Sequence, residues 1–287
     1  IGLTVVAYGT SAPEIIVGIQ AARSGHGEVV LGNVVGSNIA NIGLILGIAA
    51  LVKPASTDGS LRRRELPVLI LSTAAVPLLL FDGRIGRIEG AVLLTAAVVY
   101  TWAMVSAARG PDVLAAAQAA VSIESAAVEA GGAPPPAKSL GRAVVSAVVG
   151  LGILLFGGHF FVEGAVAVAR DLGMSDRMVG LSIVAVGTSL PELVTSVIAA
   201  RRGHSDIAVG NVVGSNIFNV LLCLGAAATI RPFSAPFDAM IGDLVALALM
   251  TGIVCVFVRS ARTITRAEGA AALGCYAAFW LFALVRS

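Results

Sequence analysis

The chain has 287 residues, of which 57% are hydrophobic and 13% are charged, about half the charged share usual in a soluble globular domain. This composition excludes a disordered chain, and the net charge of +2 without a basic stripe argues against a nucleic-acid-binding protein. The mean hydropathy of +0.94 predicts an integral membrane protein, because a soluble fold of this size could not bury so much apolar surface.

Nine apolar stretches, bounded by charged and turn residues, are candidates for membrane-spanning helices. They run over 1–22, 28–51, 66–81, 88–107, 143–169, 178–200, 207–230, 239–258 and 267–285. None shows the period-2 alternation that is typical of membrane β-barrel strands. The sequence therefore predicts an all-α polytopic membrane protein.

A polar segment rich in Gly, Pro and Ala over 108–142 separates the fourth and fifth stretches and predicts a linker. If the nine spans alternate in direction, 12 Lys and Arg residues lie in loops on the side where residue 1 starts, and 7 lie on the other side. Because cytoplasmic loops carry the excess of basic residues, we expect the linker to be cytoplasmic and the C-terminus to be outside. The expected location is the inner or plasma membrane.

The chain contains an internal repeat. Residues 1–47 align without gaps to residues 179–225, and 26 of the 47 positions are identical, which chance does not give. Five spans separate the starts of the two copies, so the copies are expected to cross the membrane in opposite directions, as in the inverted repeats of secondary transporters. We expect a first repeat over 1–107, the linker over 108–142 and a second repeat over 143–287. A span precedes only the second copy, so we expect that nine spans of ten are present and that the first helix is missing.

Each copy carries the motif Gly-Thr-Ser-x-Pro-Glu inside a predicted span, over 9–14 and 187–192. A carboxylate at the depth of Glu14 or Glu192 is costly unless it meets a cation, a partner or water. Proline removes an amide donor and Gly9 permits a bend, so the helices are expected to break near residues 7–13 and 185–191 and to free carbonyl oxygens that suit hard cations. Hydroxyl groups add further oxygen ligands at Thr10, Ser11, Thr188 and Ser189.

A second motif, Gly-Asn-Val-Val-Gly-Ser-Asn-Ile, occurs unchanged over 32–39 and 210–217. Ser37 and Asn41 are four residues apart and share a helix face, and Ser215 and Asn219 repeat this spacing. The motif has two interpretations that the sequence leaves open: neutral oxygen ligands for an ion, or close packing of small residues with polar side chains between helices.

The two motifs together, present twice in inverted halves, resemble the α-repeats of the sodium/calcium exchanger family of cation/Ca²⁺ antiporters. The resemblance implies ten helices, with helices 2, 3, 7 and 8 around the ions. It implies that Glu14 and Glu192 are the central Ca²⁺ ligands, with Thr10 and Thr188 beside them. The remaining implied ligands would form Na⁺ sites or reach the middle of the cluster: Ser11, Ser189, Ser37, Ser215, the carbonyl oxygens of Ala7 and Ala185, Asn41 and Asn219. Some relatives carry Asp at the position of Asn219, and its absence here argues against K⁺ dependence.

The expected function is secondary antiport of Na⁺ against Ca²⁺ by alternating access, with Ca²⁺ and Na⁺ as substrates in a lipid bilayer. No enzyme activity, no cofactor and no nucleic-acid partner are expected, and the functional unit is expected to be a monomer. Ca²⁺/H⁺ exchange, in which Glu14 and Glu192 would bind protons instead of Na⁺, is the alternative. A membrane serine protease using Ser37 or Ser215 with His159 is disfavoured, because both candidate nucleophiles are duplicated. Outside the motifs, Asp243 lies near one end of its span and is expected at the membrane interface.

Overall fold

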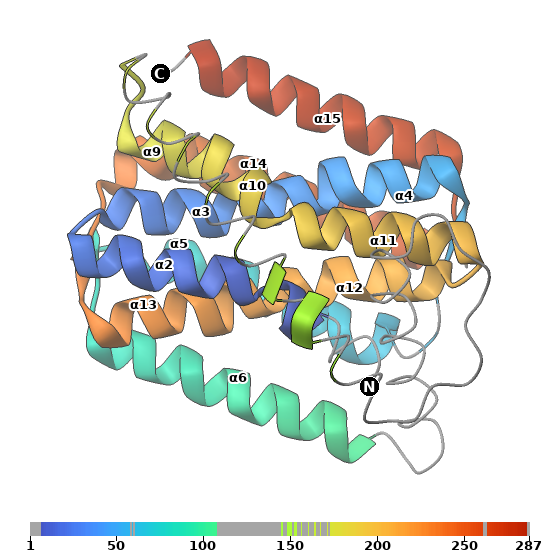
Figure 1. Cartoon of the computed structure of the whole chain (residues 1–287), viewed down its shortest axis with the longest axis horizontal. Coiled ribbons are helices and arrows are strands. Elements are labelled where there is room, and N and C mark those ends of the chain that lie inside the picture. Colours follow the sequence, from blue (N-terminus) through green and yellow to red (C-terminus); the bar gives the residue numbers. More distant parts are fainter. Residues whose placement is uncertain are drawn as a thin grey trace.

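The computed structural model is mostly helical and describes residues 7–57, 59, 61–107, 173–260 and 263–285, with scattered positions between 145 and 171 (Figure 1). In this part, five helices are long and apolar enough to cross a membrane, over 27–52, 87–106, 205–230, 237–259 and 266–285. A sixth candidate is the pair 177–188 and 190–202, bent by 42°. The predicted helical, multi-pass architecture is confirmed. The linker over 108–142 and most of the predicted span 143–169 lie outside the described residues.

The first half is built from α-helices joined by short π-helical segments, labelled η, and two-residue strands. In chain order these are α2 (Ala12–Ser24), α3 (Gly27–Ala40), η1 (Asn41–Ile45), α4 (Leu46–Val52), β1 (Ala55–Ser56), η2 (Leu61–Glu65), α5 (Leu66–Leu79), β2 (Arg84–Ile85) and α6 (Arg87–Ala107).

The second half contains α9 (Asp176–Val179), η3 (Gly180–Val184), α10 (Ala185–Thr188), α11 (Leu190–Arg202), α12 (Ser205–Phe218), η4 (Asn219–Leu224), α13 (Gly225–Ile230), β3 (Phe233–Ser234), α14 (Phe237–Ser260), β4 (Thr263–Ile264) and α15 (Arg266–Val285). From α11 onward it follows the order of the first half, except that β3 is followed directly by α14, with no π-helical segment in the place of η2.

Residues at corresponding positions of the two halves contact the opposite half. Each two-stranded antiparallel sheet takes one strand from each half, β1 with β4 and β2 with β3. The hydroxyls of Thr73 and Thr251, which are 178 residues apart, lie 3.3 Å from each other. Figure 1 shows the α2–α3 turn and the α11–α12 turn at opposite ends of the bundle. This arrangement is consistent with an inverted repeat.

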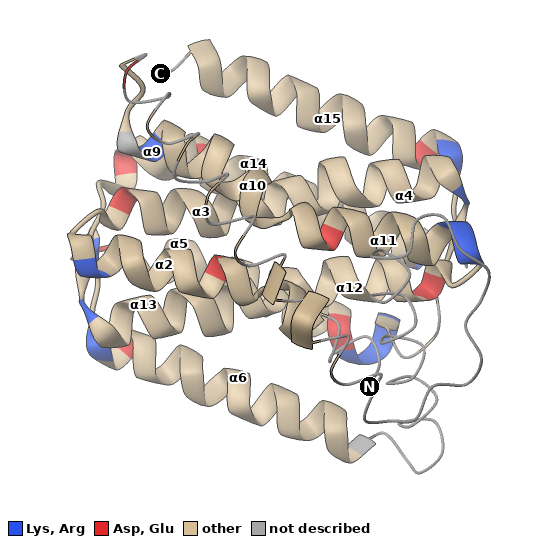
Figure 2. Cartoon of the chain, viewed as in Figure 1, with Lys and Arg blue, Asp and Glu red and all other residues tan. Residues whose placement is uncertain are grey.

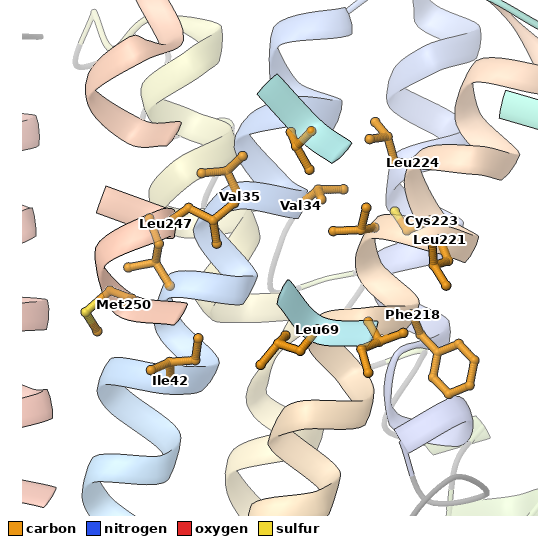
Figure 3. Packing of buried hydrophobic residues seen from close by; sticks show 14 of the residues in the cluster. Val34, Val35, Ile42, Leu69, Phe218, Leu221, Cys223, Leu224, Leu247 and Met250 are labelled. Carbon is orange, nitrogen blue, oxygen red and sulfur yellow. The ribbon is translucent and has the colours of Figure 1, made fainter. Parts of the chain in front are cut away.

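The interior is formed by two long rods, α3–η1–α4 and α12–η4–α13, which are largely buried, whereas α6 and α15 lie on the outside and are mostly exposed (Figure 1). Val34 and Val35 of α3, Leu69 of α5 and Phe218 of α12 pack in the apolar interior (Figure 3). Because lipid is as apolar as these side chains, close packing rather than exclusion of water holds such helices together. Glycines allow the closest approach: a Cβ atom on Gly32 would lie 2.9 Å from the carbonyl oxygen of Arg177.

The turns after α2 and α11 end the two helices in the same way. Gly25 and Gly203 adopt left-handed backbone conformations, with φ of 86° and 92°, that side chains rarely tolerate. A cation from the other half lies beside each of these glycines, Arg231 at Gly25 and Lys53 at Gly203. Arg231 also donates a hydrogen bond to the carbonyl oxygen of Arg23. Positive charge at a helix C-terminus complements the helix dipole, so these contacts tie the two halves together at both ends.

Asp243, which the sequence places near one end of its span, has a side chain that is fully buried within the protein. Arg177, at the start of the bent pair, donates to both carboxylate oxygens, from Nε at 2.6 Å and from Nη2 at 2.8 Å. Position along the span indicated depth, but it could not show that the side chain points inward to a partner 66 residues away. Removing one member of such a pair typically costs about 3–5 kcal/mol, because the other charge stays buried.

Candidate cation site

Both glutamate helices begin at a break, as the sequence predicts. Residues 7–10 are helical, Ser11 interrupts the helix, and α2 starts at Ala12 with Pro13 in its first turn. In the second half, Ser189 separates α10 from α11, and the two segments are bent by 42°. Proline is tolerated in a first turn because the amide it lacks has no partner there. Each break therefore places a glutamate at the start of a new helix.

The two carboxylates are fully buried and are held by serines of the opposite half. Ser189 Oγ donates to Glu14 Oε1 at 3.0 Å, and Ser11 Oγ donates to Glu192 Oε1 at 3.3 Å. Ser215 Oγ also donates to Glu192 Oε1, at 3.2 Å. Figure 2 shows Lys and Arg gathered at the ends of the helices, whereas acidic residues on α2 and α11 lie away from those ends. Each carboxylate is thus bound by a serine of the opposite half, in the interior of the bundle.

Four buried side-chain oxygens in the described part have no hydrogen-bond partner, and they come as two corresponding pairs. They are Glu14 Oε2, Glu192 Oε2, Asn41 Oδ1 and Asn219 Oδ1. An unsatisfied buried acceptor costs about 1–3 kcal/mol, and an unpaired buried carboxylate costs considerably more. Carboxylate and amide oxygens are the ligands that hard cations take in proteins.

The free oxygens of Asn41 and Asn219 are oriented by an asparagine network at the contact of α3 with α12. Asn38 and Asn216 donate to each other's backbone carbonyl oxygens, at 3.1 and 3.2 Å. Asn41 Nδ2 donates to Asn216 Oδ1 at 2.9 Å, and Asn219 Nδ2 donates to Asn38 Oδ1 at 3.0 Å. Because the amide nitrogens are used across the interface, the amide oxygens remain available. Asn41 and Asn219 each begin a π-helical segment, a feature that is frequent at functional sites.

The predicted threonines are held by two further asparagines that the predicted site does not include. Thr10 Oγ1 donates to Asn211 Oδ1 at 3.3 Å, and Thr188 Oγ1 donates to Asn33 Oδ1 at 3.2 Å. The sequence did contain a signal for these asparagines, because they belong to the second motif, which occurs unchanged in both halves. The same motif contains Asn38 and Asn216. Their partners, however, lie in the other half and cannot be found from spacing along one helix.

The remaining predicted residues lie in the same buried region. Ser37 Oγ donates to the carbonyl oxygen of Ala185 at 3.3 Å and lies 3.5 Å from Thr188 Oγ1. Ala7, the counterpart of Ala185, is fully buried, and its carbonyl oxygen accepts a bond from Ser11 N at 3.1 Å. The described part of the chain contains no group of three or more His, Cys, Asp or Glu that could hold a metal. A cation here would therefore be bound by two carboxylates and neutral oxygens.

Comparison with known proteins agrees with this architecture. The profile of the sodium/calcium exchanger protein family matches residues 1–106 and 142–285. The chain is 43% identical over 236 residues to an antiporter named CaxA from Alkalimonas amylolytica, covering 81% of this chain and 70% of that protein. It is 31% identical to the sodium/calcium exchanger MaX1 of Methanosarcina acetivorans, covering 97% and 87% of the two chains.

A solved structure of the sodium-calcium exchanger NCX_Mj, soaked with Na⁺ and Sr²⁺, superposes with a TM-score of 0.74 at 30% identity. The match covers 96% of this chain and 84% of that one. The chain therefore belongs to the sodium/calcium exchanger protein family, whose members are secondary transporters and not enzymes.

Proposed function

We propose that this protein exchanges Na⁺ for Ca²⁺ across the membrane and binds both ions at Glu14 and Glu192. The observation that carries the proposal is the set of four buried, unpartnered oxygens, two from these carboxylates and two from Asn41 and Asn219. Two negative charges neutralise one Ca²⁺ or two Na⁺. The two kinds of ion would use overlapping oxygens, so that binding of one empties the site of the other.

Neutral ligands would distinguish the ions. The proposed Na⁺ ligands are the hydroxyls of Ser11, Ser189, Ser37 and Ser215 and the carbonyl oxygens of Ala7 and Ala185. Three of the hydroxyls bond to a carboxylate, and Ser37 bonds to the Ala185 carbonyl oxygen. Thr10 and Thr188 would add oxygens beside Ca²⁺. Exchange would follow if the helices outside the core move across this region and expose it to one side of the membrane at a time.

The relatives support this assignment to different degrees. MaX1 and NCX_Mj carry names that state exchange of sodium and calcium, whereas the name of CaxA states only antiport. The resemblance implies an acidic residue in some relatives at the position of Asn219, so we propose that transport does not require K⁺. We further propose that the segment 108–142 is cytoplasmic, that the C-terminus is outside, and that one chain is the functional unit.

The proposal predicts that Na⁺ displaces Ca²⁺ from the purified protein at constant pH. If two or more Na⁺ replace one Ca²⁺, the half-saturating Ca²⁺ concentration should rise by about fourfold or more for each doubling of Na⁺. Equilibrium binding of radioactive Ca²⁺ at several Na⁺ concentrations measures this. Ca²⁺ binding that ignores Na⁺ but weakens as the pH falls would favour Ca²⁺/H⁺ exchange instead.

Ser37→Ala and Ser215→Ala should weaken Na⁺ competition more than Ca²⁺ binding, because each removes a neutral oxygen. The loss of one such contact is worth about 1 kcal/mol, or about fivefold in the affinity of one Na⁺ site. Because two Na⁺ displace one Ca²⁺ in this scheme, the Na⁺ concentration needed for half-displacement should rise about twofold. Thr95→Ala is the matched control, since the Thr95 hydroxyl bonds to Ala91 on the exposed face of α6. Equal losses of Na⁺ and Ca²⁺ binding in the two serine variants would show that these serines serve only the structure.

A further inference from the structure

The hydrogen bonds around the backbone of the two glutamate helices differ between the halves, although the proposed ion ligands occupy corresponding positions. The backbone carbonyl oxygen of Glu14 accepts two side-chain hydrogen bonds, from Asn33 Nδ2 at 3.3 Å and from Cys223 Sγ at 3.1 Å. Asn211, the counterpart of Asn33, donates instead to Ser196 Oγ, at 3.2 Å. The same asparagine therefore serves a glutamate backbone in one half and a serine side chain in the other.

The halves carry different residues at two positions beside these bonds. In the first half, α2 carries Gly18, and a Cβ atom there would lie 2.6 Å from Cys223 Sγ. The corresponding residues of the other half, 178 positions away in each case, are Ser196 and Ile45. Cys223 is fully buried in η4, near Leu221 and Leu224 (Figure 3). The absent side chain at Gly18 is what allows the thiol to reach the Glu14 carbonyl.

The carboxylates are also held differently. Glu192 Oε1 accepts bonds from both Ser11 and Ser215, whereas Ser37, the counterpart of Ser215, donates to the carbonyl oxygen of Ala185. Glu14 Oε1 accepts a bond from Ser189, and the Glu14 carbonyl oxygen accepts two side-chain bonds, whereas Glu192 Oε1 accepts two.

We propose that Cys223 and Gly18 act together to orient the peptide group of Glu14: the thiol donates to its carbonyl oxygen, and the glycine leaves room for the thiol. The two glutamates would then be inequivalent ligands in the exchange cycle. The proposal rests on the ion-binding function proposed above. Groups that hydrogen-bond to a metal-binding residue commonly change metal affinity by about 10- to 100-fold when they are removed. Ca²⁺ depends on both carboxylates together, so loss of the thiol donor should weaken Ca²⁺ binding more than Na⁺ binding.

Two substitutions at Cys223 test the donor. Cys223→Ala removes it and should raise the half-saturating Ca²⁺ concentration about tenfold, with Na⁺ competition changed less than about twofold. Cys223→Ser keeps a donor of similar size and should stay within about twofold of the wild type for both ions. An Ala variant that binds Ca²⁺ like the wild type, or a Ser variant as impaired as the Ala variant, would overturn the proposal.

A variant that carries the residues of the other half at positions 18 and 223 distinguishes a positioning role of this pair from a packing role. Gly18→Ser alone should lower the melting temperature, because its Cβ atom meets the thiol. The double variant Gly18→Ser with Cys223→Ile reproduces the pair Ser196 and Ile45, and should recover the wild-type melting temperature while keeping the weakened Ca²⁺ binding. Recovery of wild-type Ca²⁺ binding together with stability would show that the pair only packs.

Measurement of the wild type in the same binding assay tests the proposed ion-binding function separately from the proposed role of Cys223 and Gly18. If the wild type binds Ca²⁺ in competition with Na⁺, the proposed function stands whatever the variants do. If the double variant does not fold, the comparison of Cys223→Ala with Cys223→Ser still decides the question.

Discussion

Glu14→Gln and Glu192→Gln should each abolish Ca²⁺ transport. Each change keeps the size of the side chain but removes one of the two buried negative charges that would balance the ion. Leaving a buried charge without its partner costs about 3–5 kcal/mol, so Ca²⁺ uptake at subsaturating Ca²⁺ should fall by about 100-fold or more. Uptake of radioactive Ca²⁺ into proteoliposomes measures the effect.

The matched controls for this experiment are Glu89→Gln and Glu268→Gln. These residues are also corresponding glutamates, but their Oε2 atoms accept bonds from backbone amides, Gly86 N and Thr265 N, at the starts of α6 and α15. The controls should retain uptake close to that of the wild type. Near-normal Na⁺-driven uptake by Glu14→Gln or Glu192→Gln would remove the two carboxylates from the centre of the site.

Gly36→Ala should abolish transport by a different route. A Cβ atom at this position would lie 2.6 Å from the carbonyl oxygen of Leu181 and 2.8 Å from the Cβ atom of Ala185. The first of these is backbone, so α3 and the segment carrying Ala185 would have to separate. Overpacking of this kind costs about 1–3 kcal/mol or more, and it displaces Ser37 and Ala185 together.

Gly252→Ala is the control for Gly36→Ala, because no atom lies within 4 Å of a Cβ atom placed at Gly252. Alanine is the better helix former by about 1 kcal/mol, so this variant should be at least as stable as the wild type. Melting temperature in detergent and Ca²⁺ uptake in proteoliposomes distinguish the two variants. A Gly36→Ala protein with wild-type stability and uptake would contradict the close approach of α3 to the second half.

The sequence predicted the parts of the site that depend on residue type and spacing within one helix. The glutamates are buried, and the breaks fall at Ser11 and Ser189, within the regions that proline chemistry and the position of the motifs inside the spans predict. The repeat extended each of these predictions to the second half.

The sequence could not predict contacts that form only when the halves meet. The partners of Asn38 and Asn216 lie across the interface, and so does the partner of Cys223. Asp243 shows the same limit, because hydropathy places a residue along a span but does not reveal which neighbour it faces. The two orphaned amide oxygens of Asn41 and Asn219 became visible only once the amide nitrogens had found partners in the structure.

The most direct test of the central claim is Ca²⁺ uptake into proteoliposomes with Na⁺ and pH gradients imposed separately. An outward Na⁺ gradient at constant pH should drive Ca²⁺ uptake, and replacing K⁺ with choline on both sides should leave that uptake unchanged. A pH gradient without Na⁺ should drive none. Uptake that follows the pH gradient alone and is indifferent to Na⁺ would contradict Na⁺/Ca²⁺ exchange and assign the protein to Ca²⁺/H⁺ exchange.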